Sequence, residues 1–402
     1  MHFLKRIGPG LLFAGAAIGV SHLVQSTRAG ASFGYGLLWA LLLVHLFKYP
    51  FFQFGPRYAL ATGESLLEGY LKLGKGVLLA YFTITLATMF TIQTAVTIVT
   101  AGLAANLFGI TADPVIWSVI ITVISTVILL LGHYKLLDRL MKYIVLTLTL
   151  CTLLAVIIAL RGEQSPPLTQ VFPTEAASVA FLIAFMGWMP APMDISVWHS
   201  LWAIEKKKIQ PDYQIKHALG DFNLGYLSTI VLGIFFLSLG ALVMFGSGTT
   251  FSPGAGAFAG EFIDLYTSNL GSNTFLIIAL SGFTAMFSTT LTTLDASPRT
   301  MARATQLLTG RKTPFNFVFW IAILATGTIS ILLFLRSEMK TLIDLATILS
   351  FVTAPFYAIV NYTLVTSRHM PEGERPHTSM RILSCAGILF LSGFSIWYIT
   401  TL

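Results

Sequence analysis

The chain has 402 residues, of which 55% are hydrophobic and only 10% are charged. A soluble domain of this length does not need such a composition, so the sequence places the protein in the integral membrane class. The net charge of +7 is spread over short loops between apolar segments and forms no basic domain, which argues against nucleic acid as a partner.

A helix that crosses a bilayer needs about 20 predominantly apolar residues. The sequence predicts eleven such spans, at about 8–28, 34–60, 77–107, 114–132, 141–160, 176–203, 217–246, 273–296, 315–335, 341–364 and 381–401. Basic residues precede the first span, which we interpret as a transmembrane helix and not as a cleaved signal peptide. The predicted fold is therefore all-α, with residues 1–402 forming one transmembrane domain.

The basic residues predict the orientation of these spans. Nearly all of the 24 Lys and Arg residues fall on alternate loops, beginning with the N-terminus. The exceptions are Arg28, Arg161, Arg336 and Lys340 on the opposite side and Lys48 within the second span. Because cytoplasmic loops carry the excess of Lys and Arg, we expect a cytoplasmic N-terminus and an external C-terminus. The expected location is the inner (plasma) membrane of a bacterium.

Two of the predicted spans carry residues that interrupt helices. The first contains the small-residue sequence GAAIGVSH at 15–22, and the sixth contains MGWMPAPMD at 186–194. Each proline removes a backbone donor and clashes with the preceding turn. Non-helical backbone survives within a membrane only where it is buried in protein or lines a cavity, and secondary transporters place their substrate sites there.

Each interrupted span opens one half of the chain. Five spans per half give the two halves opposite topologies, as an inverted repeat requires. We therefore expect one repeat at 1–160, a second at 173–366, and an additional helix at 381–401.

Several sequence segments resemble the Nramp family of divalent-metal transporters. They are GPG at 8–10, RAGASFGYGLLW at 28–39, TGESLLE at 62–68 and His199-Ser200. The resemblance implies the leucine-transporter fold, with two inverted five-helix repeats. It also implies a central substrate site at the unwound parts of helices 1 and 6.

The chain departs from the family at that site. The family's helix 1 motif, Asp-Pro-Gly-Asn, aligns with Gly19, Val20, Ser21 and His22, so its metal-binding aspartate is missing. A fold that is inherited without its site does not carry its function.

The sixth helix departs as well, and two registers remain open there. Counting back from His199 places Pro192 at the family's metal-binding methionine, Met193 at its proline and Asp194 at its histidine. A small shift matches Met189 and the proline after it to the family's Met-Pro pair. The candidate substrate-binding residues are therefore Gly19, Ser21, His22, Met189, Pro192, Met193 and Asp194.

Asp194 and His22 are the ionisable groups at the two breaks. An acid within a span is costly and usually faces a cavity or a partner, although Asp194 could also cap the helix that follows it. His22 could bind a metal or carry a proton, or it could be a buried histidine bonded to a carbonyl. If Asp194, His22 and Met189 converged, they would suit a transition metal better than magnesium.

Lys48 lies within the second span, where it cannot easily extend its ammonium group to water. We expect it to pair with Asp194, Asp221 or Asp295, or to serve as a built-in cation near the site. Asp194, His22, Lys48 and Asp295 are thus candidates for proton or ion coupling. The run of Ser and Thr at 288–293 could supply oxygens to a sodium ion, as the fold implies, or bond neighbouring helices.

The predicted function is secondary transport of a divalent metal cation, proton-coupled or uncoupled. The alternative is a non-metal substrate, such as a small polar organic solute, because the family ligands are replaced. A third reading is a membrane sensor that transports nothing. We expect neither enzymatic activity nor a cofactor. The expected partners are a small ion or molecule and the lipid bilayer, and the oligomeric state stays open.

Overall fold

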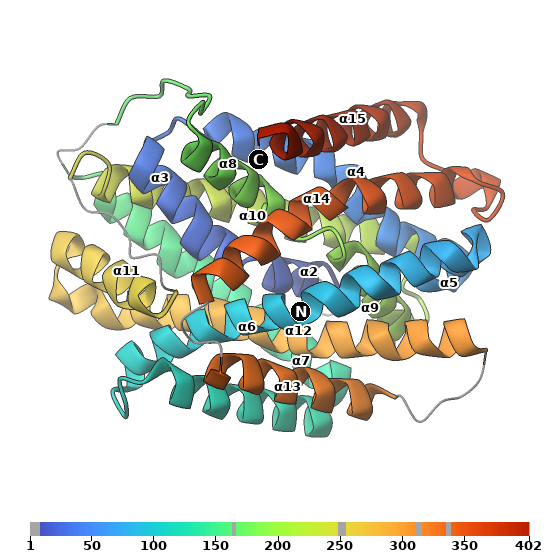
Figure 1. Ribbon diagram of the computed structural model, residues 1–402, viewed down its shortest axis with the longest axis horizontal. Coiled ribbons are helices and arrows are strands. Elements are labelled where there is room, and N and C mark those ends of the chain that lie inside the picture. Colours follow the sequence, from blue (N-terminus) through green and yellow to red (C-terminus); the bar gives the residue numbers. More distant parts are fainter. Residues whose placement is uncertain (1–8, 163–165, 248–254, 311–315, 335–338, 402) are drawn as a thin grey trace.

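In the computed structural model the described residues are 9–162, 166–247, 255–310, 316–334 and 339–401, and within them the chain forms helices and no β-strand. Most helices run along the long axis of the molecule (Figure 1). Their bounds are α2 Pro9–Ala17, α3 Thr27–Phe33, α4 Leu38–Thr62, α5 Leu66–Leu73, α6 Lys75–Phe108, α7 Pro114–Ala159, α8 Ala176–Trp188, α9 Ile195–Ile209, α10 Ile215–Val243, α11 Ala255–Leu270, α12 Phe275–Thr309, α13 Phe317–Phe334, α14 Met339–Thr366 and α15 Thr378–Thr401. A π-helix, η1, spans Ser21–Ser26, and short 3-10 turns occupy Ser272–Thr274 and Glu372–Glu374.

The length and apolar character of the described helices are those of a membrane protein. Seven of them are long and apolar enough to cross a bilayer, and an eighth span results if α2 and the bent segment Ser21–Phe33 are taken together. The number of eleven spans and the inverted repeat stay predictions.

One predicted loop is helical. The sequence predicts separate spans that end at 132 and begin at 141, but α7 continues through the stretch between them. The residues at 133–140 include no proline and no glycine, and most of them are good helix formers. With 46 residues, α7 is about twice as long as a single span of about 20 residues needs to be.

The two halves of the first broken helix pack closely against α10. A Cβ atom added to Gly225 would lie 2.1 Å from the carbonyl oxygen of Gly10, and one added to Gly240 would lie 2.1 Å from that of Thr27. Small residues allow membrane helices to approach closely. These contacts hold both halves in place and accompany a bend of 47° between them.

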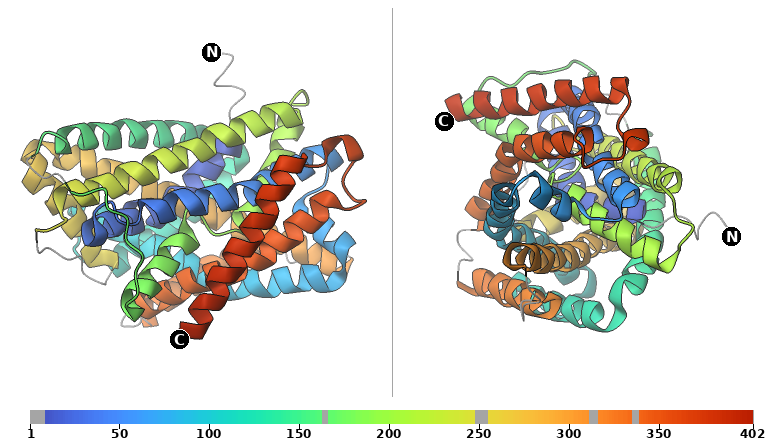
Figure 2. Two further views of the ribbon diagram at one scale, coloured as in Figure 1. Left: turned by 90° about the horizontal axis from the view of Figure 1, so that it is seen from above. Right: turned by 90° about the vertical axis from the view of Figure 1, so that its right-hand side faces the viewer.

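The broken helices lie among the longer ones. In sequence order, α8 packs against α14, and α9 packs against α4 and α2, while α12 packs along α6. The last helix, α15, packs against α4 and α14 along the outside of the molecule (Figure 2). The two breaks are therefore covered by protein, as non-helical backbone within a membrane requires.

Candidate functional site

The first helix is interrupted at 18–20, between α2 and η1, as its glycines predict. Hydroxyl groups of α12 face the carbonyl oxygens that the break leaves free. Ser288 Oγ donates to Gly15 O at 2.9 Å, and Thr289 Oγ1 lies 3.2 Å from both Gly15 O and Ile18 O. These hydroxyls bond neighbouring helices, which is one of the two roles that the sequence left open.

His22 faces α10. Its Nε2 lies 3.0 Å from Thr229 O, and its Nδ1 lies 2.8 Å from Ser21 Oγ and 3.1 Å from Ala17 O. Protein groups thus occupy both ring nitrogens, so His22 has the surroundings of a buried histidine bonded to carbonyls. Ser21 Oγ also donates to Pro190 O at 3.3 Å. This contact joins the two breaks and confirms the prediction that they face each other.

The sixth helix is interrupted where its prolines predict. The helix α8 ends at Trp188, α9 begins at Ile195, and the Met189–Pro190 peptide bond between them is cis. Neither Pro190 nor Pro192 has an N–H group to continue the helical bonding of α8. The break therefore exposes carbonyl oxygens that need donors from elsewhere.

Lys48 supplies these donors, and the expectation that it pairs with an acid is wrong. Its Nζ donates to the carbonyl oxygens of Met186 at 2.9 Å, Gly187 at 2.8 Å and Met189 at 2.8 Å, and lies 3.4 Å from that of Ala191. No ion pair of Lys48 occurs in the described part of the chain. The reason is that freed carbonyl oxygens can satisfy an ammonium group as well as a carboxylate can.

The other two acids proposed for Lys48 are engaged elsewhere. Asp221 Oδ2 accepts from the backbone N–H of Gly10 at 2.9 Å and from the Tyr213 hydroxyl at 3.1 Å. Asp295 forms an ion pair with Arg299, with Oδ1 and Nη2 2.5 Å apart. Asp295, which the sequence offers for ion coupling, therefore has a basic partner in this structure.

Asp194 is buried, with 6% of its surface exposed. It directly precedes α9 but makes no side-chain hydrogen bond that caps this helix, and its Oδ1 has no hydrogen-bond partner among the described residues. The side chain borders a cavity of about 10 Å³, which is room for about one water molecule. The cavity is lined by Ile84, Thr88, Ile92, Pro192, Met193, Asp194, Ser350, Thr353 and Tyr357.

A second cavity lies between the two breaks. Its volume is about 30 Å³, and it shares Ile92 and Pro192 with the Asp194 cavity. Its walls are aromatic and aliphatic, with three hydroxyl groups. They are Ala16, Ala17, Gly19, Val20, Ser21, Ile92, Val96, Trp188, Pro192, Ile195, Trp198, Thr289 and Thr293.

These two cavities separate the candidate residues into groups. Gly19 and Ser21 line the cavity between the breaks, Met193 and Asp194 line the other, and Pro192 lines both. His22 and Met189 line neither, and the described residues contain no group of three His, Cys, Asp or Glu side chains that could hold a metal. Asp194, His22 and Met189 therefore do not line one common cavity, and their convergence on a metal stays a prediction.

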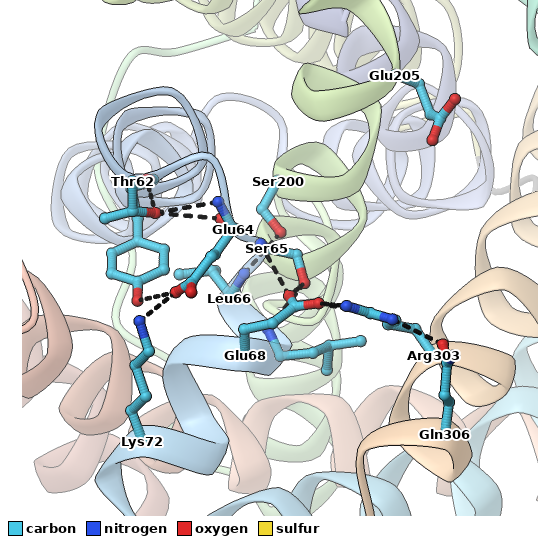
Figure 3. A network of polar contacts seen from close by, with 12 residues as sticks. Thr62, Glu64, Ser65, Leu66, Glu68, Lys72, Ser200, Glu205, Arg303 and Gln306 are labelled. Carbon is cyan, nitrogen blue, oxygen red and sulfur yellow. Dashed lines mark hydrogen bonds and ion pairs between the residues drawn. The ribbon is translucent and has the colours of Figure 1, made fainter. Parts of the chain in front are cut away.

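A polar cluster at the far end of α4 was missed in the sequence (Figure 3). Glu68 of α5 closes a capping box with Ser65 and contacts Arg303 of α12, while Lys72 and Glu64 form an ion pair at 2.5 Å. The spacing Ser-x-x-Glu is the signal for a capping box, but nothing in the sequence shows which helix supplies the arginine.

His199 of α9 is a second residue whose environment the sequence does not show. It is fully buried, and neither ring nitrogen has a partner in the described structure. Its ring packs against those of Phe13 and Phe222, at centroid distances of 5.8 and 5.6 Å. A buried imidazole without hydrogen bonds is unusual and marks His199 as a functional candidate.

Comparisons with known proteins agree with this geometry. An uncharacterized protein of Pasteurella multocida is 36% identical over 402 residues, covering 98% of this chain and 91% of that protein. A divalent metal cation transporter, MntH, of Levilactobacillus brevis is 26% identical, covering 91% and 81%. Among solved structures, a manganese transporter of Eremococcus coleocola aligns with a TM-score of 0.77 at 13% identity, covering 99% of this chain and 86% of that one. The nucleobase-cation-symport transporter Mhp1 aligns with a TM-score of 0.64 at 15% identity, covering 98% and 93%.

These two solved structures are similar to this chain in fold, and both are structures of transporters. The profile of the family described as "Natural resistance-associated macrophage protein-like" matches residues 10–401, which is nearly the whole chain. The protein is therefore an integral membrane protein, and it belongs to the Nramp family.

Proposed function

We propose that this protein is a secondary transporter for a divalent metal cation, bound between the broken helices with Asp194 as its anionic ligand. The observation that carries the proposal is that Asp194 lines a cavity while its buried Oδ1 has no hydrogen-bond partner among the described residues. Burying an unpaired carboxylate is costly, and intramembrane acids mark ion and substrate pathways. The names of the relatives, divalent metal cation transporter and manganese transporter, support a metal as the missing partner.

The side chains around Asp194 favour a hard cation. Thr88, Ser350 and Thr353 each donate their hydroxyl proton to a carbonyl oxygen one turn earlier, which leaves oxygen lone pairs to accept from or bind a ligand. One lone pair of Ser350 Oγ is used, because it accepts from Trp188 Nε1 at 3.0 Å. Carboxylate, hydroxyl and water oxygens suit manganese and magnesium better than soft metals. With one carboxylate and few side-chain donors, the cation would keep part of its water shell.

A fixed ammonium group close to the site would repel a divalent cation, but Lys48 lines neither of the two cavities. Its ammonium group is bound by backbone carbonyl oxygens at the end of α8. These oxygens carry partial negative charge and offset part of the positive field at the break. The lysine is therefore compatible with a cation at Asp194.

For coupling, we propose that Asp194 exchanges a proton for the cation, because one carboxylate oxygen cannot hold both at once. Transport of a proton in the same direction as the metal would need a second carrier. His199, with both ring nitrogens unpartnered in the described structure, is the best candidate for that role. The sodium alternative is weaker, because Thr289 lines the cavity between the breaks but Ser288 does not, and the residues that line this cavity include no carboxylate.

The proposed cycle keeps the predicted topology. Residues 1–160 and 173–366 are the two repeats, which rock against each other, and 381–401 is an additional helix. The N-terminus is proposed to be cytoplasmic and the C-terminus external, in the plasma membrane of a bacterium, as the distribution of basic residues indicates.

A second candidate is transport of a small organic cation. The cavity between the breaks is lined by Trp188 and Trp198 together with aliphatic side chains, and it borders the cavity of Asp194 through Ile92 and Pro192. A ligand with an apolar group in the cavity between the breaks and an ammonium group at the Asp194 carboxylate would occupy both cavities. Indole rings attract cations and pack well against apolar groups.

A ligand screen by thermal shift on the purified protein separates these candidates. A ligand that binds only the folded state raises the melting temperature as its concentration increases. Under the main proposal, manganese raises the melting temperature of the unmodified protein and of Asp212→Asn, a change at an exposed acid. The same ion leaves Asp194→Asn unchanged.

Stabilisation by alkylammonium ions and not by metals would instead support the second candidate. If a metal stabilises Asp194→Asn as strongly as the unmodified protein, the site is wrong. If manganese binds but is not carried into proteoliposomes, the chain acts as a sensor and not as a transporter.

A further inference from the structure

The C-terminal end of α8 leaves a set of carbonyl oxygens without backbone donors. In a continuous helix, the oxygen of Met186 would accept from residue 190 and that of Trp188 from residue 192, but both positions are proline. The oxygen of Gly187 loses its partner because the chain leaves the helix after Trp188. Such groups must find other donors when they are buried away from water.

Most of these oxygens converge on one nitrogen. Lys48 of α4 is fully buried, and its Nζ lies within 2.9 Å of the carbonyl oxygens of Met186, Gly187 and Met189. The oxygen of Ala191 adds a longer contact at 3.4 Å. Lys48 therefore bonds the last turn of α8 and the non-helical segment after it at the same time.

The three short bonds define the chemistry of the group that fits here. An ammonium group has three N–H donors, whereas a neutral amine has two donors and a lone pair that carbonyl oxygens would repel. The partial negative charge at the C-terminus of a helix also favours a cation. The carbonyls of Met186, Gly187, Met189 and Ala191 thus form a cage for a cation that donates three hydrogen bonds, and we refer to them as the α8 cage.

The rest of the break is bonded from other directions. Pro190 O accepts from Ser21 Oγ at 3.3 Å, and Met193 O accepts from Ser196 Oγ at 2.8 Å. Gly187 also lies close to α14, because a Cβ atom there would stand 2.7 Å from Thr347 O. Lys48 is the shared donor to the cage oxygens in the described structure, so its removal would free several carbonyls at once.

We propose that the α8 cage is a binding site for a primary ammonium group and that Lys48 fills it permanently as a tethered cation. In this role Lys48 is a positioning residue: it holds the end of α8 and residues 189–191 at a fixed place relative to α4. It thereby sets the position of Pro192 and Asp194, which follow directly in the chain. The inference goes beyond the proposed function, because it holds whatever substrate binds at Asp194.

Removal of the tether should turn the cage into a site for free ammonium ions. In Lys48→Ala the side chain is shortened by three methylene groups and the amine, which is the size of propylammonium. We expect Lys48→Ala to melt at a lower temperature than the unmodified protein. Propylammonium should restore at least half of this loss in a saturable manner, and methylammonium should restore less.

Three controls make the test specific. Lys48→Met fills the same space with an apolar chain, so propylammonium should leave its melting temperature unchanged. Lys75→Ala removes an exposed lysine, and neither the change nor the added amine should shift its melting temperature. Tetramethylammonium carries the charge but no N–H donor, and it should fail to stabilise Lys48→Ala.

The results can overturn the inference in two ways. Equal stabilisation of Lys48→Ala by propylammonium and tetramethylammonium, or of Lys48→Ala and Lys48→Met by propylammonium, means that no donor-specific cage exists. If Lys48→Ala cannot be purified, Lys48→Met decides: a normal melting temperature there shows that the carbonyls do not need the ammonium group. An alkylammonium ion that binds at Asp194 would stabilise Lys75→Ala and the unmodified protein as well, so only the additional stabilisation of Lys48→Ala reports on the cage. A failure of the proposed function can therefore be distinguished from a failure of this inference.

Discussion

Acidic side chains have different partners at the corner between α4 and α5 and at the break between α8 and α9. At the corner of α4 and α5, Glu64 pairs with Lys72 and Glu68 pairs with Arg303 (Figure 3). At the break, Asp194 has no base within ion-pair distance in the described structure, and its Oδ1 has no hydrogen-bond partner. The acids at the corner are paired with basic side chains of the protein, whereas the carboxylate at the break is available to a ligand.

The energetic meaning of this contrast follows from exposure. The side chains of Lys72 and Glu64 are 41% and 34% exposed, and pairs in such surroundings contribute about 0–1 kcal/mol. Asp194 is buried, where an unpaired carboxylate is far more costly. Because no described protein group pairs with the buried carboxylate of Asp194, we infer that a ligand does. The paired acids at the corner have a structural role instead.

The sharpest test of this comparison removes one carboxylate from each region. We expect Asp194→Asn to lower manganese uptake into proteoliposomes by about 100-fold, equivalent to about 3 kcal/mol, because the cation loses its only anionic ligand. Glu64→Gln, a matched change at the corner, should alter uptake less than about twofold, in keeping with the small value of an exposed pair. Equal losses in the two variants would show that the distinction between the regions is wrong.

The family aspartate cannot simply be restored in the first helix. A Cβ atom at Gly19 would lie 2.3 Å from Thr289 Oγ1, so any side chain at Gly19 must displace that threonine. We expect Gly19→Ala to lower the free energy of unfolding by about 2 kcal/mol, a usual cost of overpacking.

The same substitution in a Thr289→Ala background tests the cause. There the cost of Gly19→Ala should be less than half as large, because the two changes are coupled through direct contact. Unfolding in mixed micelles with increasing SDS measures all four proteins. An unchanged cost would mean that the clash is not with Thr289.

Glu68 should matter more for stability than Glu64, although both belong to the corner. Glu68 accepts from the backbone N–H of Ser65 at 2.9 Å and also contacts Arg303, so it closes the start of α5 and ties this helix to α12. We expect Glu68→Met, which removes the capping bond, to cost about 1 kcal/mol, the usual value of a helix cap. Arg303→Met should cost less, because it leaves the capping bond intact, and SDS unfolding would reveal the reverse order if the ion pair dominates.

Sequence reasoning located the breaks because their causes are local. Two prolines at 190 and 192 and the glycines at 15 and 19 act on their own turns of helix, and the structure interrupts both helices there. The partner of Lys48 was mispredicted because it depends on distant backbone. The prediction assumed that a buried lysine needs a carboxylate, although the prolines had already freed carbonyl oxygens that could take its place.

The site itself was only partly predictable for the same reason. Asp194 stands out in the sequence as an acid after a break, but the side chains that line its cavity come from α6 and α14. His22 looked like an equal candidate, yet it faces α10 and bonds Thr229 O. Which way a side chain points from a broken helix depends on packing that spacing along the chain does not encode.

The smallest expected effect concerns Lys72. Its ion pair with Glu64 is short but exposed, so Lys72→Met should lower the free energy of unfolding by about 0.5 kcal/mol or less. Salt weakens interactions between exposed charges, so the difference from the unmodified protein should vanish in concentrated sodium chloride. SDS unfolding at low and high salt measures this change. A loss above 1 kcal/mol that persists in salt would show that the fold requires the pairing of Glu64 with Lys72. The contrast between this corner and Asp194 would then rest on burial alone.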